Sequence, residues 1–217
     1  MTASLLILFL ALTPHQARQK AIGSTVTVEG HVTVASGVFR SFMNDNGFVV
    51  SDAIGGIYVV TDYRAYHSLG SDVRVIGTLA DNGHGLLVLR AVSITSGKGH
   101  ALVRPWKVER PQLDEFYEGK LVRAEGEIVR LVSDLPYGHK LILRRGGSEL
   151  QVFLPATVMP DPGLLTAGRK VEVTGFCAQY DQTYEIVVRS ARDLVGAPKS
   201  PSPQRDPPRS GGRCTGW

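Results

Sequence analysis

The sequence predicts an all-β protein built from two copies of one small barrel domain. Three blocks of the chain recur in the same order, and each has the pattern of a strand. Strand-like runs alternate residue types with period two, as in Thr25–Val28. Glycine also lies inside the long first strand of each copy, at Gly30 and Gly126, where it often marks a bend at a barrel corner. A pair of small sandwiches is the alternative, whereas the repeat argues against one large sandwich.

The internal repeat sets the domain boundaries. Residues 23–30 and 119–126 share the pattern G-x-x-V-x-x-E-G, and residues 70–77 and 168–175 share G-x-x-V-x-V-x-G. A third block, V-x-R, follows in both copies. Such repetition indicates one structural unit present twice. The predicted organisation is a first domain at 21–97, a linker at 98–118 and a second domain at 119–195.

Each domain is predicted to hold five strands. Runs rich in β-branched and aromatic residues, separated by turn residues, place the later strands of the first domain at 48–50, 57–60, 73–79 and 86–94. The same criteria place the strands of the second domain at 120–132, 140–145, 149–154, 170–178 and 184–192.

Two short helices are expected as connections. One or two helical turns are predicted at 63–68, between the third and fourth strands of the first domain. A short helix is predicted at 111–118 in the linker, with Leu113, Phe116 and Tyr117 packing on the second barrel.

The two ends of the chain differ in composition from the repeats. Residues 5–12 form an unbroken apolar run, too short to span a bilayer but typical of a secretory signal. The sequence therefore predicts a signal peptide at 1–20, with a cleavage residue at Ala17, and an extracytoplasmic location, periplasmic or secreted. A buried N-terminal strand or a misplaced start codon is the alternative. Residues 196–217 are rich in Pro, Ser and Gly, which predicts a flexible tail.

These blocks resemble the OB-fold, in particular the OB-type domains of bacterial exported proteins. The resemblance is carried by the strand patterns at 23–30, 47–59 and 70–77. The stretch 113–177 is similar to OB domains in the extracytoplasmic halves of bacterial sensor proteins. The resemblance implies two tandem five-stranded OB-type Greek-key barrels with short connecting helices. It also implies a ligand face on strands two and three, which binds single-stranded nucleic acid or oligosaccharide in many members and protein in others.

Charge gives little support for nucleic acid as the ligand. The formal net charge is +4, but residues 1–22 carry +2 and residues 196–217 carry +3, so the stretch between them carries −1. Affinity for a polyanion comes mainly from neutralising phosphates. The near-neutral domains therefore need a local basic patch if they are to bind nucleic acid.

The candidate ligand residues are aromatic and basic side chains near the second and third strands of each domain. Aromatic rings would stack on bases and basic groups would contact phosphates. The second domain offers the better groove, because its predicted second strand carries three basic residues. The candidates are Arg40, Phe48 and Tyr58 in the first domain, and Tyr137, Lys140, Arg144, Arg145 and Phe153 in the second.

No pattern for catalysis, metal binding or a cofactor stands out. The six histidines have no metal-ligand spacing, and neither C-x-x-C, H-E-x-x-H nor G-x-S-x-G occurs. We therefore predict a protein that is not an enzyme and holds no cofactor. The two cysteines, Cys177 and Cys214, allow a mutual disulfide, a free thiol or a bond to another chain.

Two functions stay open from the sequence. The first is a module that binds single-stranded nucleic acid or another extended polymer. The second is a protein–protein or envelope adaptor, which an apolar rather than basic groove face would favour. Neither function requires a membrane span in the mature chain.

Overall fold

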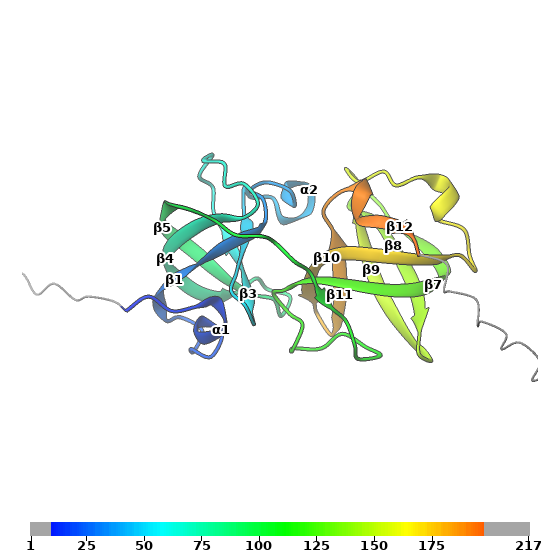
Figure 1. The fold of residues 1–217 in the computed structure, drawn as a ribbon, viewed down its shortest axis with the longest axis horizontal. Helices are drawn as coiled ribbons and strands as arrows, with labels where there is room; N and C mark the ends of the chain where they lie inside the picture. The colour runs from blue at the N-terminus through cyan, green and yellow to red at the C-terminus, as the bar shows by residue number, and fades with distance from the viewer. Residues whose placement is uncertain (1–9, 198–217) are drawn as a thin grey trace, which may run out of the picture.

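Two five-stranded β-barrels lie side by side in the computed structural model, which describes residues 10–197 (Figure 1). The first barrel is closed, with the strand order β1-β2-β3-β5-β4. Antiparallel pairing of β1 with β4 closes it, and β3 pairs in parallel with β5. Its strands are β1 (Thr25–Val34), β2 (Phe48–Ser51), β3 (Gly56–Val60), β4 (Ser71–Asp81) and β5 (Leu87–His100).

The second barrel repeats the same order. Strands β7, β8, β9, β11 and β10 follow one another in the sheet, and pairing of β10 with β7 closes it. Two short strands, β6 (Trp106–Lys107) and β12 (Leu194–Gly196), extend this sheet. The barrel strands are β7 (Leu121–Asp134), β8 (Gly138–Arg145), β9 (Ser148–Pro155), β10 (Lys170–Tyr180) and β11 (Thr183–Val188).

The strand register confirms the repeat and the predicted fold class. Gly30 lies opposite Val73 in the first barrel, and Gly126 lies opposite Val171 in the second. A Cβ atom on Gly30 would come within 2.6 Å of the Ser51 carbonyl oxygen, so only glycine fits this bend. Two tandem OB-type barrels are therefore the architecture of residues 21–196.

The two predicted connecting helices are absent. Residues 61–68 form neither helix nor strand. The Tyr63 amide donates to Thr61 Oγ1, and His67 exchanges hydrogen bonds with Ser36. These partners satisfy the backbone groups that a helix would otherwise pair.

The linker segment 111–118 forms successive turns instead of a helix. Asp114 Oδ1 accepts a hydrogen bond from the Phe116 amide, a local bond that competes with helix formation. The expected packing is partly confirmed, because Leu113 and Tyr117 enter the core of the second barrel while Phe116 is 44% exposed.

The helices that do form are short. They are α1 (Pro14–Ala17), α2 (Arg40–Met43) between β1 and β2, and two 3-10 turns, η1 (Pro162–Leu164) and η2 (Ala191–Asp193). Within residues 10–197, no helix has the length and apolar character needed to cross a membrane.

The N-terminal segment packs on the first barrel. Leu12 forms a bridge with Val28 of β1, and Ala17 is fully buried in the barrel core. Thr13 and Gln16 form a capping box around α1, with Pro14 at its first turn. Leu12 thus pairs with β1, as the alternative of a buried N-terminal strand anticipates. Residues 1–9, which include most of the apolar run 5–12, lie outside the described residues, so export stays a prediction.

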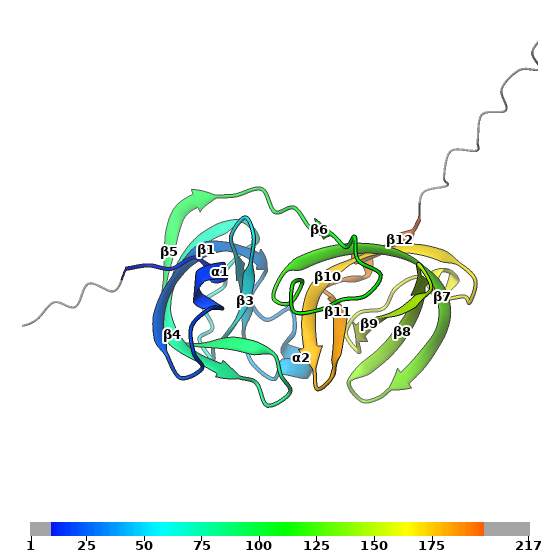
Figure 2. The ribbon, with the colours of Figure 1, turned by 90° about the horizontal axis from the view of Figure 1, so that it is seen from below.

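Strands β10 and β11 of the second barrel lie next to the first barrel (Figure 2). The facing outer surfaces of the two barrels share one apolar core. Phe176 of β10 lies between Phe39 and Tyr58 of the first barrel, with ring centroids 5.8 Å and 6.0 Å away. Such separations are typical of stabilising aromatic pairs. The cluster comprises Val34, Phe39, Val49, Tyr58, Leu86 and Val88 from the first barrel, and Phe153, Phe176, Ala178 and Val187 from the second.

The backbones of the two barrels come closest at two glycines. A Cβ atom on Gly56 would lie 2.0 Å from the Gly119 carbonyl oxygen, and one on Gly119 would lie 2.1 Å from the Gly56 oxygen. Gly119 also has a φ of +80°, which side chains rarely adopt. Glycine at both positions therefore sets the spacing of the barrels.

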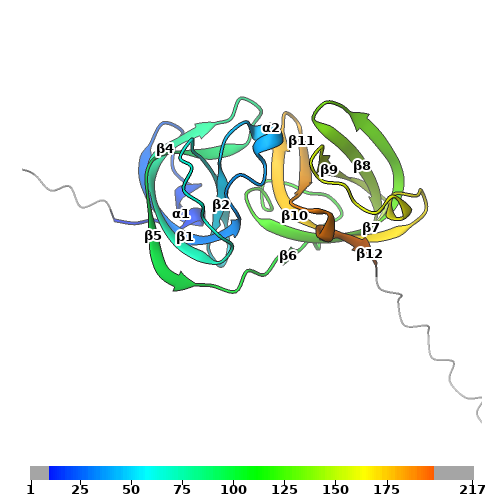
Figure 3. The ribbon, with the colours of Figure 1, turned by 90° about the horizontal axis from the view of Figure 1, so that it is seen from above.

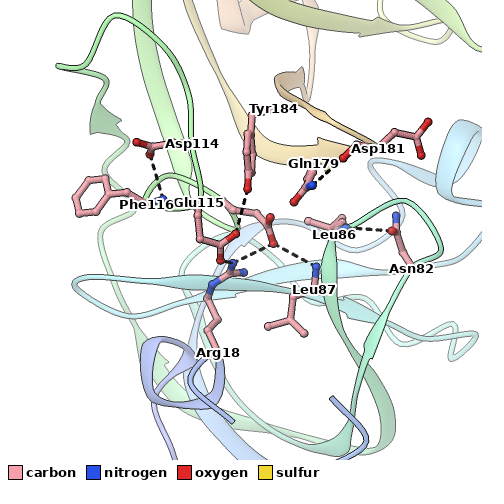
Figure 4. A network of polar contacts seen from close by, with 11 residues as sticks. Arg18, Asn82, Leu86, Leu87, Asp114, Glu115, Phe116, Gln179, Asp181 and Tyr184 are labelled. Atoms are coloured by element: carbon pink, nitrogen blue, oxygen red, sulfur yellow. Dashed lines mark hydrogen bonds and ion pairs between the residues drawn. The ribbon is translucent and has the colours of Figure 1, made fainter. Parts of the chain in front are cut away.

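A buried ion pair joins the N-terminal segment to the linker that precedes the second barrel (Figure 4). Arg18 Nη2 lies 2.9 Å from Glu118 Oε1 and 2.6 Å from Glu115 Oε1. Glu118 also accepts a hydrogen bond from the Leu87 amide of β5. Burial raises the pKa of Glu118, while the Arg18 charge acts against that rise. The network thus links α1, the first barrel and the linker.

Replacing Gly56 by alanine should separate the barrels. The added methyl group meets a backbone carbonyl, so we expect Gly56→Ala to lower the free energy of unfolding by about 1–3 kcal/mol. Urea unfolding measures this change, and hydrogen exchange of the Leu87 amide should quicken. Gly196→Ala is the matched control, because its nearest neighbouring atom is 3.8 Å away. Equal stabilities of the two variants would contradict the close approach.

Removing Arg18 should destabilise the protein strongly. The side chain of Arg18 is 10% exposed and that of Glu118 is 1% exposed, so Arg18→Ala leaves a buried carboxylate without its cation. We expect a loss of roughly 3–5 kcal/mol in urea unfolding. Arg74→Ala breaks the exposed pair with Glu29 and should cost less than about 1 kcal/mol. A similar loss in both variants would show that the Arg18 pair does not join the barrels.

Candidate functional site: a pocket between the barrels

A pocket of about 480 Å³ lies between the two barrels, within the size range of ligand sites. Connections from both barrels surround it. The β1–β2 connection contributes Met43 and Asp45, and the β4–β5 turn contributes Asn82 and His84. The second barrel contributes Tyr137 from its β7–β8 turn and Tyr180 at its β10–β11 turn. These four connections correspond to the two loops of each OB barrel that ordinarily contact ligands.

The outer face of the second barrel forms the floor of this pocket. Lys140 on β8 and Phe153 on β9 are cross-strand neighbours, and Glu185 on β11 pairs with Gln151 on β9. Strands β8 and β9 are strands two and three of the second barrel. The pocket therefore includes the ligand face that the fold predicts, with the first barrel as its opposite wall.

Asp45 is a buried carboxylate in the pocket wall. It is 8% exposed, and its Oδ1 accepts hydrogen bonds from the Tyr58 hydroxyl at 2.6 Å and the Gly47 amide at 2.7 Å. Burial raises the pKa of Asp45, and the two hydrogen bonds act in the opposite direction. No ion pair joins Asp45 to a cation within the described residues.

Glu185 is a second buried carboxylate, on the floor. It is 6% exposed, and Gln151 Nε2 donates to its Oε2 at 2.7 Å. Lys140 lies near but forms its ion pair with Asp134, at 3.1 Å. Burial raises the pKa of Glu185, the hydrogen bond from Gln151 and the charge of Lys140 lower it, and Asp134 raises it. The floor is thus a set of fixed donors and acceptors in which two carboxylates lie near one cation.

Two tyrosine rings are accessible at the pocket. Tyr137 is 57% exposed and Tyr180 is 49% exposed. His84 stacks on Tyr180, with ring centroids 4.4 Å apart, and its Nδ1 lies 3.0 Å from Asp181 Oδ1. The Asp181 amide also donates to the His84 carbonyl. Because His84 and Tyr180 belong to different barrels, this contact fixes the Tyr180 ring.

Three of the candidate residues from the second domain meet at the pocket, namely Tyr137, Lys140 and Phe153. Phe153 is 5% exposed and contributes mainly to the inter-barrel core. Arg144 and Arg145 are not among the lining residues. Arg144 pairs with Glu127 at 2.5 Å, and Arg145 donates to the carbonyl oxygens of Val108 and Arg110. Arg145 therefore anchors the linker rather than facing a groove.

The candidates from the first domain do not form a groove. Phe48 lies inside the first barrel and Tyr58 lies in the inter-barrel core, both fully buried. Neither ring has a face available for stacking, which differs from the expectation. Phe48 points into the core of its own barrel, and Tyr58 is covered by the second barrel. Arg40 is exposed at the start of α2 and does not line the pocket.

Several pocket residues escaped the sequence analysis, above all Asp45 and Glu185. Asp45 lies in a run that reads as a turn, and Glu185 lies in an ordinary strand. Their burial results from packing of the barrels, which no local pattern reports. Residues 81–85 have the composition of a turn, but nothing in the sequence indicated that this turn contacts the second barrel.

Within residues 10–197, no three His, Cys, Asp or Glu side chains are grouped so as to hold a metal ion. Cys177 is a free, fully buried thiol, and burial raises its pKa well above the ordinary value. A disulfide to Cys214, one of the three alternatives that the sequence leaves open, involves a residue outside the described part of the chain.

Exposed apolar side chains lie on and near the β7–β8 hairpin beside the pocket, with Leu131 and Val132 on opposite faces of β7. The β7–β8 hairpin exposes Leu131, Val132 and Leu135 by 41%, 42% and 68%. Met159 is 84% exposed and follows Ala156, whose amide donates to the Tyr137 carbonyl at the hairpin turn. We call Leu131, Val132, Leu135 and Met159 the hairpin patch.

Comparison with known proteins yields structural likenesses at low sequence identity. No protein-family model matches the chain, and no curated protein matches it. The tetrameric p202 HIN2 is similar with a TM-score of 0.36 at 12% identity, over 77% of this chain and 88% of that chain. The p204 HINb domain is similar with a TM-score of 0.32 at 10% identity, over 77% and 94%. These TM-scores are too low to assign a fold or a function. The fold is assigned from the strand order of the two barrels, and the function is inferred from the pocket.

Neutralising Glu185 should stabilise the protein at neutral pH. The pKa of Glu185 in the folded protein lies above the ordinary value of 4.5, so folding favours the protonated carboxyl. The contribution of this group to the free energy of unfolding is fully present below pH 4.5 and is lost as the pH rises through the folded pKa. We expect Glu185→Gln to be more stable than wild type at pH 8 and equally stable at pH 4, by urea unfolding. The exposed Glu29→Gln variant is the control and should show no such gain. A loss of stability at pH 8 would contradict a burial penalty at Glu185.

Proposed function

We propose that this protein is a non-catalytic binding module that holds a segment of an extended polymer in the pocket between its barrels. The proposal rests on one observation above all. In an OB barrel, two connections ordinarily contact the ligand. Here these two connections of each barrel meet at one pocket, which residues of strands two and three of the second barrel also line. Four loops on a rigid scaffold are a common way to build a binding site.

The pocket has the chemical composition of a binding site. Aromatic rings, apolar side chains and a few fixed polar groups line it, as in most ligand sites. Buried Asp45 and Glu185 reduce the stability of the interface, a pattern that proteins tolerate at functional sites.

The test is binding of labelled probes to the full chain and to a pocket variant. The probes are a single-stranded oligothymidine and linear oligosaccharides, followed by fluorescence anisotropy. Tyr137→Ala removes an exposed ring from the pocket, so we expect about tenfold or greater weakening for whichever probe binds.

Tyr66→Ala is the matched control for that experiment. Tyr66 is 71% exposed on the first barrel and is not a lining residue, so binding should not change. Absence of binding by every probe, or equal effects of both variants, would reject the pocket as a polymer site.

A protein-interaction module is the second candidate, favoured by the hairpin patch. Exposed apolar residues grouped beside a groove often mark a protein interface. Pairing of the neighbouring basic residues points the same way, since Lys140 and Arg144 are neutralised by Asp134 and Glu127. This candidate gains if no polymer probe binds.

A further inference from the structure

We infer that the pocket recognises an uncharged, polyhydroxylated chain, that is, a segment of a neutral polysaccharide, rather than a polyphosphate. This inference rests on the proposed function and names its ligand class. Three kinds of observation carry it: the charge of the pocket, the geometry of its polar groups and the state of its aromatic rings.

The charge of the pocket does not suit a phosphate chain. The lining includes three carboxylates, Asp45, Asp134 and Glu185, against two permanent cations, Arg90 and Lys140. Single-strand binding instead requires a groove with excess positive charge.

Three cations on β7 and β8 of the second barrel are also already paired. Lys140 lies against Asp134, and Arg144 lies against Glu127. Arg130 forms two hydrogen bonds with Glu149, at 3.0 Å and 3.1 Å. A phosphodiester would have to displace carboxylates that are fixed on the same sheet, and it would lie near two further buried carboxylates.

The polar groups instead suit hydroxyl groups, which both donate and accept. Lys140, Arg90 and the amide nitrogen of Asn82 offer donors, and Asp134 and Glu185 offer acceptors, whereas the Asn82 oxygen already accepts from the His84 and Leu86 amides. Glu185 is held by Gln151, so the position of its carboxylate is set before a ligand arrives. Preorganised groups of both kinds can satisfy adjacent hydroxyls without a net charge on the ligand.

The rings complete this arrangement. A sugar ring has an apolar C–H face that packs on an aromatic ring, while its hydroxyls project from the rim. Tyr180 is covered on one face by His84 at an interplanar angle of 16°, so the opposite face is the one left for a ligand. Tyr137 supplies a second exposed ring from the β7–β8 turn. Both rings carry hydroxyls that can bind at their outer edges.

The deciding experiment applies the full chain to an array of linear neutral oligosaccharides, their anionic counterparts and single-stranded oligothymidine. We expect one or more neutral oligosaccharides to bind, and their anionic counterparts to bind at least about tenfold more weakly. Neutral-ligand affinity should not change between low and high salt, because no counterions are released. Tyr137→Ala should weaken binding about tenfold or more, whereas Tyr66→Ala should leave it unchanged.

Glu185→Gln gives an independent measure of the polar contact. It keeps one oxygen to accept from Gln151 and replaces the other acceptor oxygen by an amide donor. We expect weaker binding of the neutral oligosaccharide with a fold that is retained at pH 7, as checked by urea unfolding.

The outcomes separate the inference from the proposed function. Salt-sensitive binding of oligothymidine that Tyr137→Ala abolishes would overturn the ligand class and retain the pocket as a polymer site. Preference for anionic oligosaccharides would likewise overturn the ligand class and retain the pocket as a polymer site. Absence of binding by every probe would overturn both.

Discussion

The apolar contact between the barrels is the constraint on which the rest of the structure depends. The two parallel strand pairs place Tyr58 opposite Val88 in the first barrel and Phe153 opposite Val187 in the second, and all four residues belong to the shared core. Equivalent outer faces of the repeated domain are thus turned toward each other (Figure 3). This contact covers the ligand face of the first barrel, because burial of its apolar surface lowers the free energy of the folded protein. The second barrel loses only the part around Phe153.

The part of the two facing surfaces that this contact does not cover forms the pocket. Burial of the aromatic cluster brings the β4–β5 turn of the first barrel against the β10–β11 turn of the second, where Asp181 donates to the His84 carbonyl. It also encloses Asp45 and Glu185, whose ionised forms are disfavoured by burial. An interface selected only for stability would have little use for such groups. Their position in a cavity, beside exposed tyrosines, supports the proposed binding role.

The sequence and the structure agree best where the signal is local. Period-two runs and repeated glycines predicted the strands, and the closed barrels follow from them. The helices predicted at 63–68 and 111–118 do not form, because side-chain hydrogen bonds satisfy backbone amides there. Among the candidate ligand residues, Phe48 and Tyr58 carried the right chemistry but lie in two different cores. Arg145 likewise has the right charge, yet its donors are used by linker carbonyls.

The sequence by itself determined the fold class, the duplication and the strand order within each copy. These follow from residue periodicity and from glycine at bends, which act over a few residues. Only the tertiary structure decided where a ligand can bind. Whether an outward ring such as Tyr58 or Tyr137 is buried or accessible depends on the partner barrel, and the partner is placed by Gly56 and Gly119. These are long-range contacts between surfaces of separate domains, so no local pattern in either domain encodes which face stays open.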